Sequence, residues 1–171
     1  MKRLLAVLLL AGCSLPQEPL PRLMEVPSFR LTGTTSAGKT FPVEKRDLLK
    51  KPWVASFLFT SCAGPCPATA LQLAKLPKDL RVVTVTVDPA TDTPRVLARY
   101  AEELGAGENW WFLTGKPADV KALVIDGFKL PIVGQGPQLT HSTKLALVDG
   151  ANYVRGYYDS AEELLKDLQR L

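Results

Sequence analysis

The sequence contains few residues that bind metals or carry out redox chemistry. Its 171 residues include three cysteines and one histidine. Cys13 falls in a signal sequence, described below, so two thiols and one imidazole remain for the folded part. A structural zinc site normally uses four protein ligands. The composition therefore disfavours such a zinc site.

The sequence also has no block of basic residues of the kind that binds nucleic acid. Its formal net charge is +4, from 21 basic and 17 acidic residues. Lys2 and Arg3 lie in a segment that we expect to be removed, so the mature chain has 21 − 2 = 19 basic residues and a charge of +2. There are no internal repeats, and the length suits one domain with its own core. We therefore expect no nucleic-acid partner.

The N-terminus has the pattern of a bacterial lipoprotein signal. Two basic residues precede an apolar run at residues 4–10, which is too short to span a bilayer. The following Leu-Ala-Gly-Cys at 10–13 resembles the lipobox, in which the cysteine receives a lipid and becomes the new N-terminus. This resemblance implies a lipoprotein signal peptide at residues 1–12 and lipidation of Cys13.

A proline-rich segment separates Cys13 from the predicted domain. Residues 13–27 contain four prolines, which favour an extended, semi-rigid chain. We interpret this segment as a membrane tether and expect the folded domain at residues 28–171.

Predicted strands and helices alternate through that domain. Residues 53–59 and 81–87 are apolar runs typical of buried strands, whereas residues 126–140 predict an irregular loop. The order of the elements predicts an α/β, thioredoxin-like fold with helices on both faces of the sheet. The predicted strands are 29–32, 40–41, 53–59, 81–87, 110–113, 144–148 and 152–157, and the predicted helices are 44–50, 67–76, 94–104, 117–125 and a last one after Ser160.

Cys62 and Cys66 lie at the turn between strand 53–59 and the helix that begins at Pro67. A helix N-terminus favours the thiolate form of a nearby cysteine. Such a pair can exchange electrons as a disulfide or bind a soft metal. Three residues separate the two cysteines, against two in thioredoxin motifs. A static disulfide is less favoured, because so small a ring removes little entropy from the unfolded chain.

His141 lies shortly before strand 144–148, at the end of the predicted loop. Alone, a histidine is more often a surface side chain than a ligand. Together with Cys62 and Cys66 it would complete a set suited to copper, because thiolates favour Cu(I) and imidazole accepts either oxidation state. The residues by themselves leave both copper binding and redox chemistry open.

Asp88 and Asp92 lie in the loop that follows strand 81–87. The carboxyl ends of parallel strands share one edge of a sheet, so we expect this loop to lie beside the cysteine loop. The simpler role of the two aspartates is to form the turn and cap the next helix. The alternative is that one of them tunes the thiols or contacts a partner.

Four segments together resemble the Sco/SenC family over roughly residues 24–170. They are CxxxCP at 62–67, DPxxDTP at 88–94, a W-x-L-T-G stretch at 111–115 and His141-Ser142 before a strand. The resemblance implies a thioredoxin-like fold with an N-terminal β-hairpin and an inserted strand–helix element at 110–125. It also implies copper, as Cu(I), Cu(II) or both, bound by Cys62, Cys66 and His141.

The family assists assembly of cytochrome c oxidase. The resemblance therefore implies delivery of copper to the CuA centre of oxidase subunit II, or preparation of that centre. The domain would face the periplasm or extracytoplasmic space from a lipid anchor in the bacterial cell membrane. A copper donor or a thiol reductant would be a further partner.

An enzymatic alternative is a thiol–disulfide oxidoreductase that reduces the CuA-ligand cysteines of subunit II. Its catalytic dithiol would be Cys62 and Cys66, whereas copper binding should also need His141. This difference makes His141 the residue that discriminates between the two functions. A peroxiredoxin-like peroxidase is disfavoured, because no activating arginine pattern occurs near Cys62.

Overall fold

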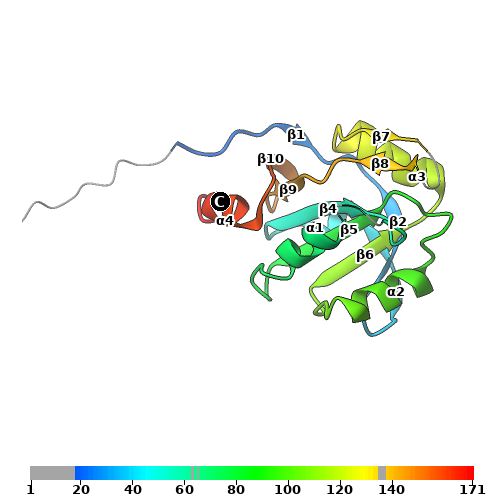
Figure 1. Ribbon diagram of the computed structural model, residues 1–171. Coiled ribbons are helices and arrows are strands. Elements are labelled where there is room, and N and C mark those ends of the chain that lie inside the picture. Colours follow the sequence, from blue (N-terminus) through cyan, green and yellow to red (C-terminus); the bar gives the residue numbers. More distant parts are fainter. Residues whose placement is uncertain (1–17, 63, 65, 135–137) are drawn as a thin grey trace, which may run out of the picture.

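The computed structural model describes residues 18–62, 64, 66–134 and 138–171, with the backbone alone for Cys66 (Figure 1). Its main feature is an eight-stranded mixed sheet in the order β1-β10-β9-β4-β5-β6-β2-β3. The strands are β1 Met24–Glu25, β2 Arg30–Thr34, β3 Thr40–Glu44, β4 Trp53–Leu58, β5 Arg81–Thr86, β6 Trp110–Thr114, β9 Leu145–Val148 and β10 Tyr153–Tyr158. The helices are η1 Lys45–Leu48, α1 Cys66–Leu73, α2 Pro94–Glu103, α3 Pro117–Lys121, η2 Ala122–Gly127 and α4 Ala161–Leu168.

Three parallel strands, β4, β5 and β6, form the centre of the sheet. Every residue of β4 is buried, as expected for a strand covered on both faces. Strands β4 and β5 pair from Trp53↔Arg81 to Leu58↔Thr86. Their carboxyl ends therefore meet at one edge, which confirms that the loops following them are neighbours.

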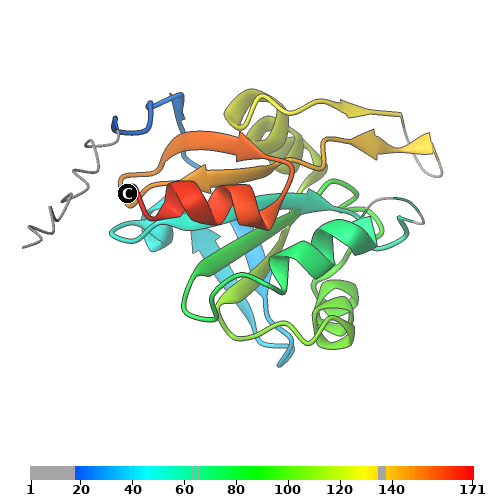
Figure 2. The same cartoon turned by 60° about the vertical axis from the view of Figure 1, so that its left-hand side comes forward.

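Helices cover both faces of this sheet. In Figure 2, α1 and α4 lie in front of the sheet, and α3 with η2 lies behind it. Phe128, just after η2, packs edge-on against Trp53 and Phe57 of β4, with ring centroids 6.2 and 5.1 Å apart. These contacts close the core on the rear face and confirm the predicted α/β architecture.

The N-terminal segment packs on the domain along part of the predicted tether. Strand β1 pairs with β10, and Leu20 and Val26 are 6% and 0% exposed. Arg155 donates hydrogen bonds to the carbonyls of Leu20 and Pro21. The proline-rich composition indicates an extended chain but carries no information about docking. Residues 18–27 therefore form part of the folded unit.

Two further elements differ from the sequence-based expectation. Residues 126–140, expected as an irregular loop, include η2's last residues, strand β7 Ile132–Val133 and the first residue of β8 Thr140–His141. The helix predicted at 117–125 begins as α3 and continues as the π-helix η2. The first difference arises because Gly and Pro mark chain reversals without showing whether the flanking residues pair.

Within the described part of the chain, no helix combines the length and apolar character needed to cross a membrane.

Candidate metal and redox site

Cys62 lies in a turn that directly follows the buried strand β4. Its backbone N–H donates to the carbonyl of Phe59 at 3.2 Å, which reverses the chain at residues 59–62. Cys62 is half-buried and carries a free thiol. We call residues 59–62 the cysteine turn. A short turn after a fully buried strand gives this thiol a defined position at the carboxyl edge of the sheet.

Cys66 is the first residue of α1, one position earlier than the predicted helix start at Pro67. The N-terminus of α1 therefore lies at the cysteine itself, where a helix dipole favours a thiolate. The side chain of Cys66 lies outside the described residues, as do residues 63 and 65. The pairing of the two sulfur atoms stays a prediction.

His141 lies on the short strand β8, which pairs with β7 in a separate two-stranded sheet. We call this pair of strands the histidine hairpin. His141 Nδ1 is 2.7 Å from the carbonyl oxygen of Ser142. A carbonyl only accepts hydrogen bonds, so Nδ1 carries the proton and the lone pair of a neutral ring lies on Nε2. Metal-binding histidines commonly show this arrangement.

The environment of His141 favours the neutral ring. Burial lowers the pKa of His141 below its usual 6.5, although the hydrogen bond to Ser142 acts in the opposite direction. A metal competes with a proton for the imidazole lone pair. The lowered pKa therefore leaves the ring able to bind a metal at neutral pH.

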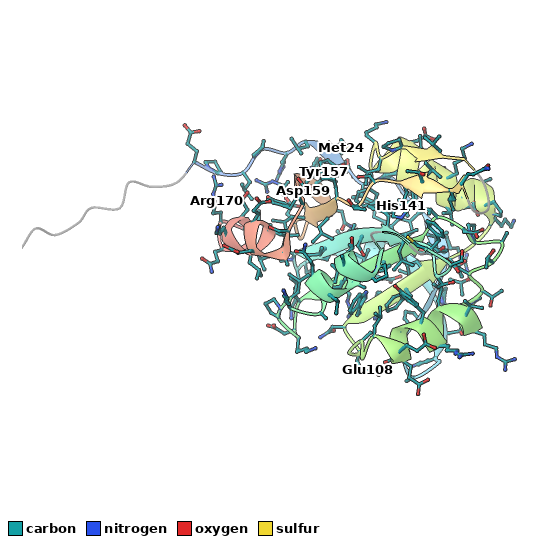
Figure 3. All side chains as sticks on the ribbon, in the orientation of Figure 1. Met24, Glu108, His141, Tyr157, Asp159 and Arg170 are labelled. Atoms are coloured by element: carbon teal, nitrogen blue, oxygen red, sulfur yellow. The ribbon has the colours of Figure 1, made fainter. Side chains whose placement is uncertain are left out.

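A ring contact joins the histidine hairpin to the cysteine turn. The rings of Phe59 and His141 meet edge-to-face with centroids 5.7 Å apart. In Figure 3, His141 lies beside β8 on the side toward the central sheet. Phe59 precedes Cys62 by three residues, so the fold brings His141 next to the turn that presents the thiol. Two of the three predicted ligands, Cys62 and His141, thus lie in neighbouring regions of the structure.

The described side chains do not by themselves form a cluster of three or more His, Cys, Asp or Glu residues with metal-binding geometry. The set of described side chains excludes that of Cys66. Two thiolates with one imidazole would fit copper better than Mg²⁺ or Ca²⁺, which prefer oxygen ligands.

Asp88 and Asp92 occupy different environments in the loop after β5. Asp92 is 0% exposed and accepts hydrogen bonds from Thr60, in the cysteine turn, and from Thr86. Asp88 is half-buried, and its backbone N–H donates to Thr86 Oγ1 at 3.0 Å. The backbone carbonyl of Asp88 accepts the N–H groups of Thr91 and Asp92. Asp88 is thus the turn-forming residue, and Asp92 reaches the cysteine turn.

The predicted start of the following helix is confirmed. Thr93 Oγ1 accepts the N–H of Val96 at 3.3 Å, and Pro94 is the first residue of α2. Thr93, rather than either aspartate, is therefore the N-cap.

Sequence reasoning missed Thr60, Thr86 and Phe59 as parts of this site. Phe59 ends a continuous apolar run, so its position indicates only burial. Thr60 and Thr86 directly follow or end a predicted strand, where threonine is common. Their involvement could have been suspected only from their place at the carboxyl ends of neighbouring strands.

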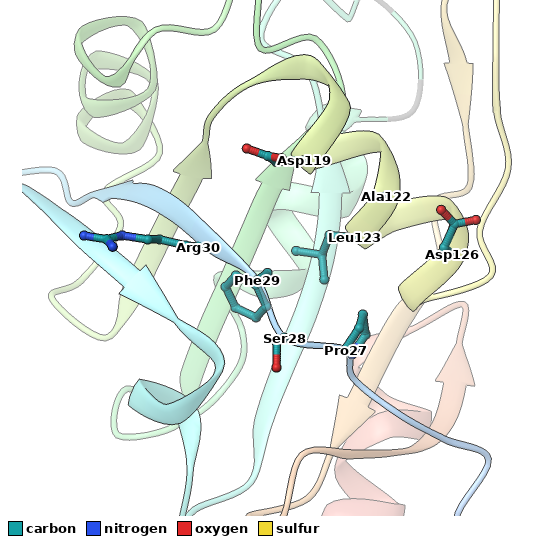
Figure 4. A pocket seen from close by; sticks show the side chains of 8 residues that line it. All are labelled: Pro27, Ser28, Phe29, Arg30, Asp119, Ala122, Leu123 and Asp126. Atoms are coloured by element: carbon teal, nitrogen blue, oxygen red, sulfur yellow. The ribbon is translucent and has the colours of Figure 1, made fainter.

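The structure has one cavity beside the candidate site and another that is separate from it. One, of about 450 Å³, separates the Asp88 loop from the histidine hairpin, and its lining includes Asp88, Ala90, Val120, Lys121, Ile132 and Leu139. Another, of about 520 Å³, is shown in Figure 4 and lies between residues 27–30 and the α3–η2 helix. None of the residues lining this second cavity belongs to the cysteine turn or to β8. The second cavity is therefore separate from the candidate site.

Comparison with known proteins identifies the family. The family profile described as SCO1/SenC matches residues 19–171, which is most of the chain. The chain belongs to the SCO1/SenC family. A SCO1/SenC family lipoprotein from Bacillus anthracis is 30% identical, with a TM-score of 0.76 over 86% of this chain and 94% of that one.

Two further relatives of this SCO1/SenC protein have informative names. BsSco, described with a disulfide switch and as a member of the Sco family of cytochrome c oxidase assembly proteins, is 27% identical with a TM-score of 0.72 over 90% of this chain and 95% of that one. A protein of Stutzerimonas stutzeri named for copper binding is 31% identical over 166 residues, 89% of this chain and 77% of that protein. The close structural matches confirm the thioredoxin-like fold.

Proposed function

We propose that this protein binds copper through Cys62, Cys66 and His141 and acts in the assembly of cytochrome c oxidase. In this role it delivers copper to the CuA centre of subunit II by exchange between thiolate ligands. The observation that carries the proposal is the contact between the ring of His141 and Phe59 of the cysteine turn, with ring centroids 5.7 Å apart. Membership in the SCO1/SenC family and the name of the Stutzerimonas relative support copper as the cargo.

The three proposed ligands have different roles. The thiolates of Cys62 and Cys66 hold the metal and exchange with the thiolates of the receiving protein. His141 adds a nitrogen ligand through Nε2, while its Nδ1 proton stays on the carbonyl of Ser142. Such an outer contact orients the ring and makes the other nitrogen a better ligand. Release then requires only that the receiving site replaces these ligands one at a time.

A direct test is an anaerobic titration of the reduced protein, residues 18–171, with Cu(I) and with Cu(II). We expect one copper ion per chain and, for Cu(II), a thiolate-to-metal charge-transfer absorption. Binding at several weak sites, or binding that persists when both cysteines are blocked by alkylation, would contradict the proposal.

A second candidate function is reduction of the CuA-ligand cysteines of subunit II. The free thiol of Cys62 and the position of Cys66 at the start of α1 favour it, and a disulfide switch is described for BsSco. One thiolate would attack the partner disulfide to give a mixed disulfide, and the other would displace the partner thiol. The partner gains two electrons and two protons, and this protein becomes the Cys62–Cys66 disulfide.

One experiment separates the two functions. The reduced protein, with and without copper, is mixed with the oxidised CuA domain of subunit II. Appearance of free thiols on that domain without copper indicates reduction, whereas copper transfer to a domain reduced beforehand indicates delivery. Movement of neither electrons nor metal would count against both functions.

The N-terminal end of the described chain suits a membrane anchor. The first described residues and the C-terminus lie at the end of the molecule opposite to the histidine hairpin (Figures 1 and 2). A lipid on Cys13, as implied by the lipobox, would leave the site facing the extracytoplasmic space. Expression of the full chain in a bacterium tests this anchor. We expect the wild-type protein in the membrane fraction and Cys13→Ser outside it.

A further inference from the structure

Asp92 is a fully buried carboxylate next to the cysteine turn. Burying a carboxylate is costly unless hydrogen bonds replace its hydration. Asp92 receives them from two residues. The backbone N–H of Thr60 lies 3.1 Å from Oδ2 and 3.3 Å from Oδ1, the Thr60 hydroxyl donates to Oδ1, and the Thr86 hydroxyl donates to Oδ2 at 2.5 Å. Hydrogen bonds to an ionised acceptor are stronger than neutral ones.

These bonds occur at the point where β4 leaves the sheet. The last bond between β4 and β5 that follows the parallel pattern runs from Val87 N–H to the carbonyl of Leu58 at 2.8 Å. Thr60 lies beyond that bond, and its N–H is accepted by the carboxylate of Asp92 instead of by a strand. Asp92 therefore fastens the exit of β4 to the end of β5.

The fastened residue lies between the two predicted ligand regions. On one side of Thr60, Phe59 contacts the ring of His141 and accepts the N–H of Cys62 through its carbonyl. On the other side, two residues later, is the thiol of Cys62. Movement of Thr60 would therefore move both the thiol and the ring contact.

Helix capping does not account for Asp92. The N-cap of α2 is Thr93, whose side chain accepts the N–H of Val96. The Asp92 carboxylate instead accepts hydrogen bonds from Thr86 of β5 and from Thr60 of the cysteine turn. This orientation indicates a role directed at that turn.

We propose that Asp92 is a positioning residue for the Cys62–Cys66 centre and acts through Thr60. It holds the cysteine turn in the geometry that copper binding and dithiol chemistry require. This inference rests on the proposed function, because it assigns Asp92 to the same centre. Residues that hydrogen-bond directly to a metal ligand typically change the metal affinity about 10–100-fold, and Asp92 lies one contact further out, so we expect an effect at the lower end of that range. A disulfide tolerates only a narrow range of Cα separations, so the same turn also sets the dithiol–disulfide equilibrium.

Asp92→Asn is the main test, in residues 18–171 of the protein. Asparagine keeps the size, but its amide brings an N–H₂ donor toward hydroxyl and N–H groups that need an acceptor. We expect the Cu(II) affinity to fall about tenfold or more. We also expect the equilibrium with dithiothreitol to shift about threefold or more. In that equilibrium the Cys62–Cys66 disulfide gains two electrons and two protons, and dithiothreitol becomes its cyclic disulfide.

Asp149→Asn is the matched control. Asp149 is also buried, at 7% exposure, and accepts the backbone N–H groups of Ala151 and Tyr153 at 2.9 Å each. It follows β9 beyond Val148, which pairs with Trp53 at the start of β4. The control therefore removes a buried carboxylate near the start of β4, whereas Asp92 acts at the end of β4. We expect a lower melting temperature, with copper affinity and redox equilibrium within about twofold of wild type.

Thr60→Val provides an independent test should Asp92→Asn fold poorly. Valine keeps the shape and the backbone N–H and removes only the hydroxyl donor to Asp92. We expect a smaller shift in the same direction, and no further shift when it is added to Asp92→Asn, because residues acting through one contact are not additive.

The outcomes separate this inference from the proposed function. If the folded Asp92→Asn and Thr60→Val proteins match wild type in both measurements, the positioning role is wrong. The same holds if Asp149→Asn shifts them as far. If the wild-type protein neither binds copper nor cycles with dithiothreitol, the proposed function itself is wrong.

Discussion

The cysteine turn and the histidine hairpin carry the proposed ligands on supports of very different size. The cysteine turn continues β4, a fully buried strand in the middle of an eight-stranded sheet, and Asp92 fastens it to β5. The histidine hairpin is a separate two-stranded sheet in which Ile132 pairs with His141 and Val133 with Thr140. The ring contact between Phe59 and His141 joins the two regions.

The different supports of the two regions determine which functions can be separated by mutation. Dithiol chemistry needs only the cysteines, whose support is the core of the domain. The proposed copper site also needs the imidazole, whose support is an attached element. Loss of the imidazole should therefore affect metal binding alone, whereas loss of either thiol should affect both activities.

The largest effect is expected for Cys62→Ser and Cys66→Ser. Each variant should lose the charge-transfer absorption of Cu(II) and all dithiol cycling, because both activities need two sulfur atoms. Anaerobic copper titration and reduction of an oxidised CuA domain measure the two activities. Ser61→Ala, an exposed position in the same turn, serves as the control. Retention of either activity by a single-cysteine variant would contradict the requirement for two sulfur atoms.

The next effect is expected for His141→Ala. Cu(II) affinity should fall more than about 100-fold, beyond the usual effect of an outer contact, because a direct ligand is lost. The equilibrium with dithiothreitol should stay within about twofold of wild type. Competition titration with a copper chelator measures the first quantity, and Thr140→Ala on the same strand is the control. Equal copper affinity in wild type and variant would remove His141 from the site.

A smaller effect is expected for Phe59→Leu, which removes the ring contact between the two regions. Edge-to-face ring pairs contribute about 0.5–1.5 kcal/mol beyond their burial, so we expect a loss of stability of that size in urea unfolding. Cu(II) affinity should fall about threefold, because His141 loses a packing partner. An effect on copper as large as that of His141→Ala would mean that Phe59 determines the position of the whole hairpin.

The smallest effect is expected in the pH dependence of the stability of the metal-free protein. Because the pKa of His141 is lowered in the folded state, the unfolded chain takes up a proton first as the pH falls. The stability that this group contributes is therefore present above pH 6.5 and is lost as the pH falls through the lowered folded value. Urea unfolding between pH 7.5 and pH 5 should show a shallower loss for His141→Gln than for wild type.

Asp149 serves as the control for the pH dependence of unfolding. Burial by itself would raise the pKa of Asp149, but hydrogen bonds from Tyr153, Arg155 and Ala151 together outweigh it and leave the pKa below 3.8. Its contribution is present above pH 3.8 and is lost at lower pH. Asp149→Asn should therefore leave the slope between pH 7.5 and pH 5 unchanged. An equal slope in wild type and His141→Gln would contradict the burial of the imidazole.

Much of the fold can be predicted because its signals are local. The strand at Trp53–Leu58 follows from an uninterrupted apolar run, and the start of α2 follows from Thr93 and Pro94. The meeting of the two loops at one sheet edge follows from the parallel order of their strands. The histidine hairpin cannot be predicted in this way, since its four paired residues have no alternation long enough to indicate strands.

Sequence alone determined which atoms are available for chemistry: two thiols at a strand-to-helix turn, one imidazole, and a family pattern that relates them. These are properties of residue type and spacing, which the chain carries before it folds. Tertiary structure decided how they are held. It aimed the buried Asp92 at Thr60 and placed Phe59 against His141. Those contacts join residues 32 and 82 positions apart along the chain. They depend on packing in three dimensions, which no local pattern encodes.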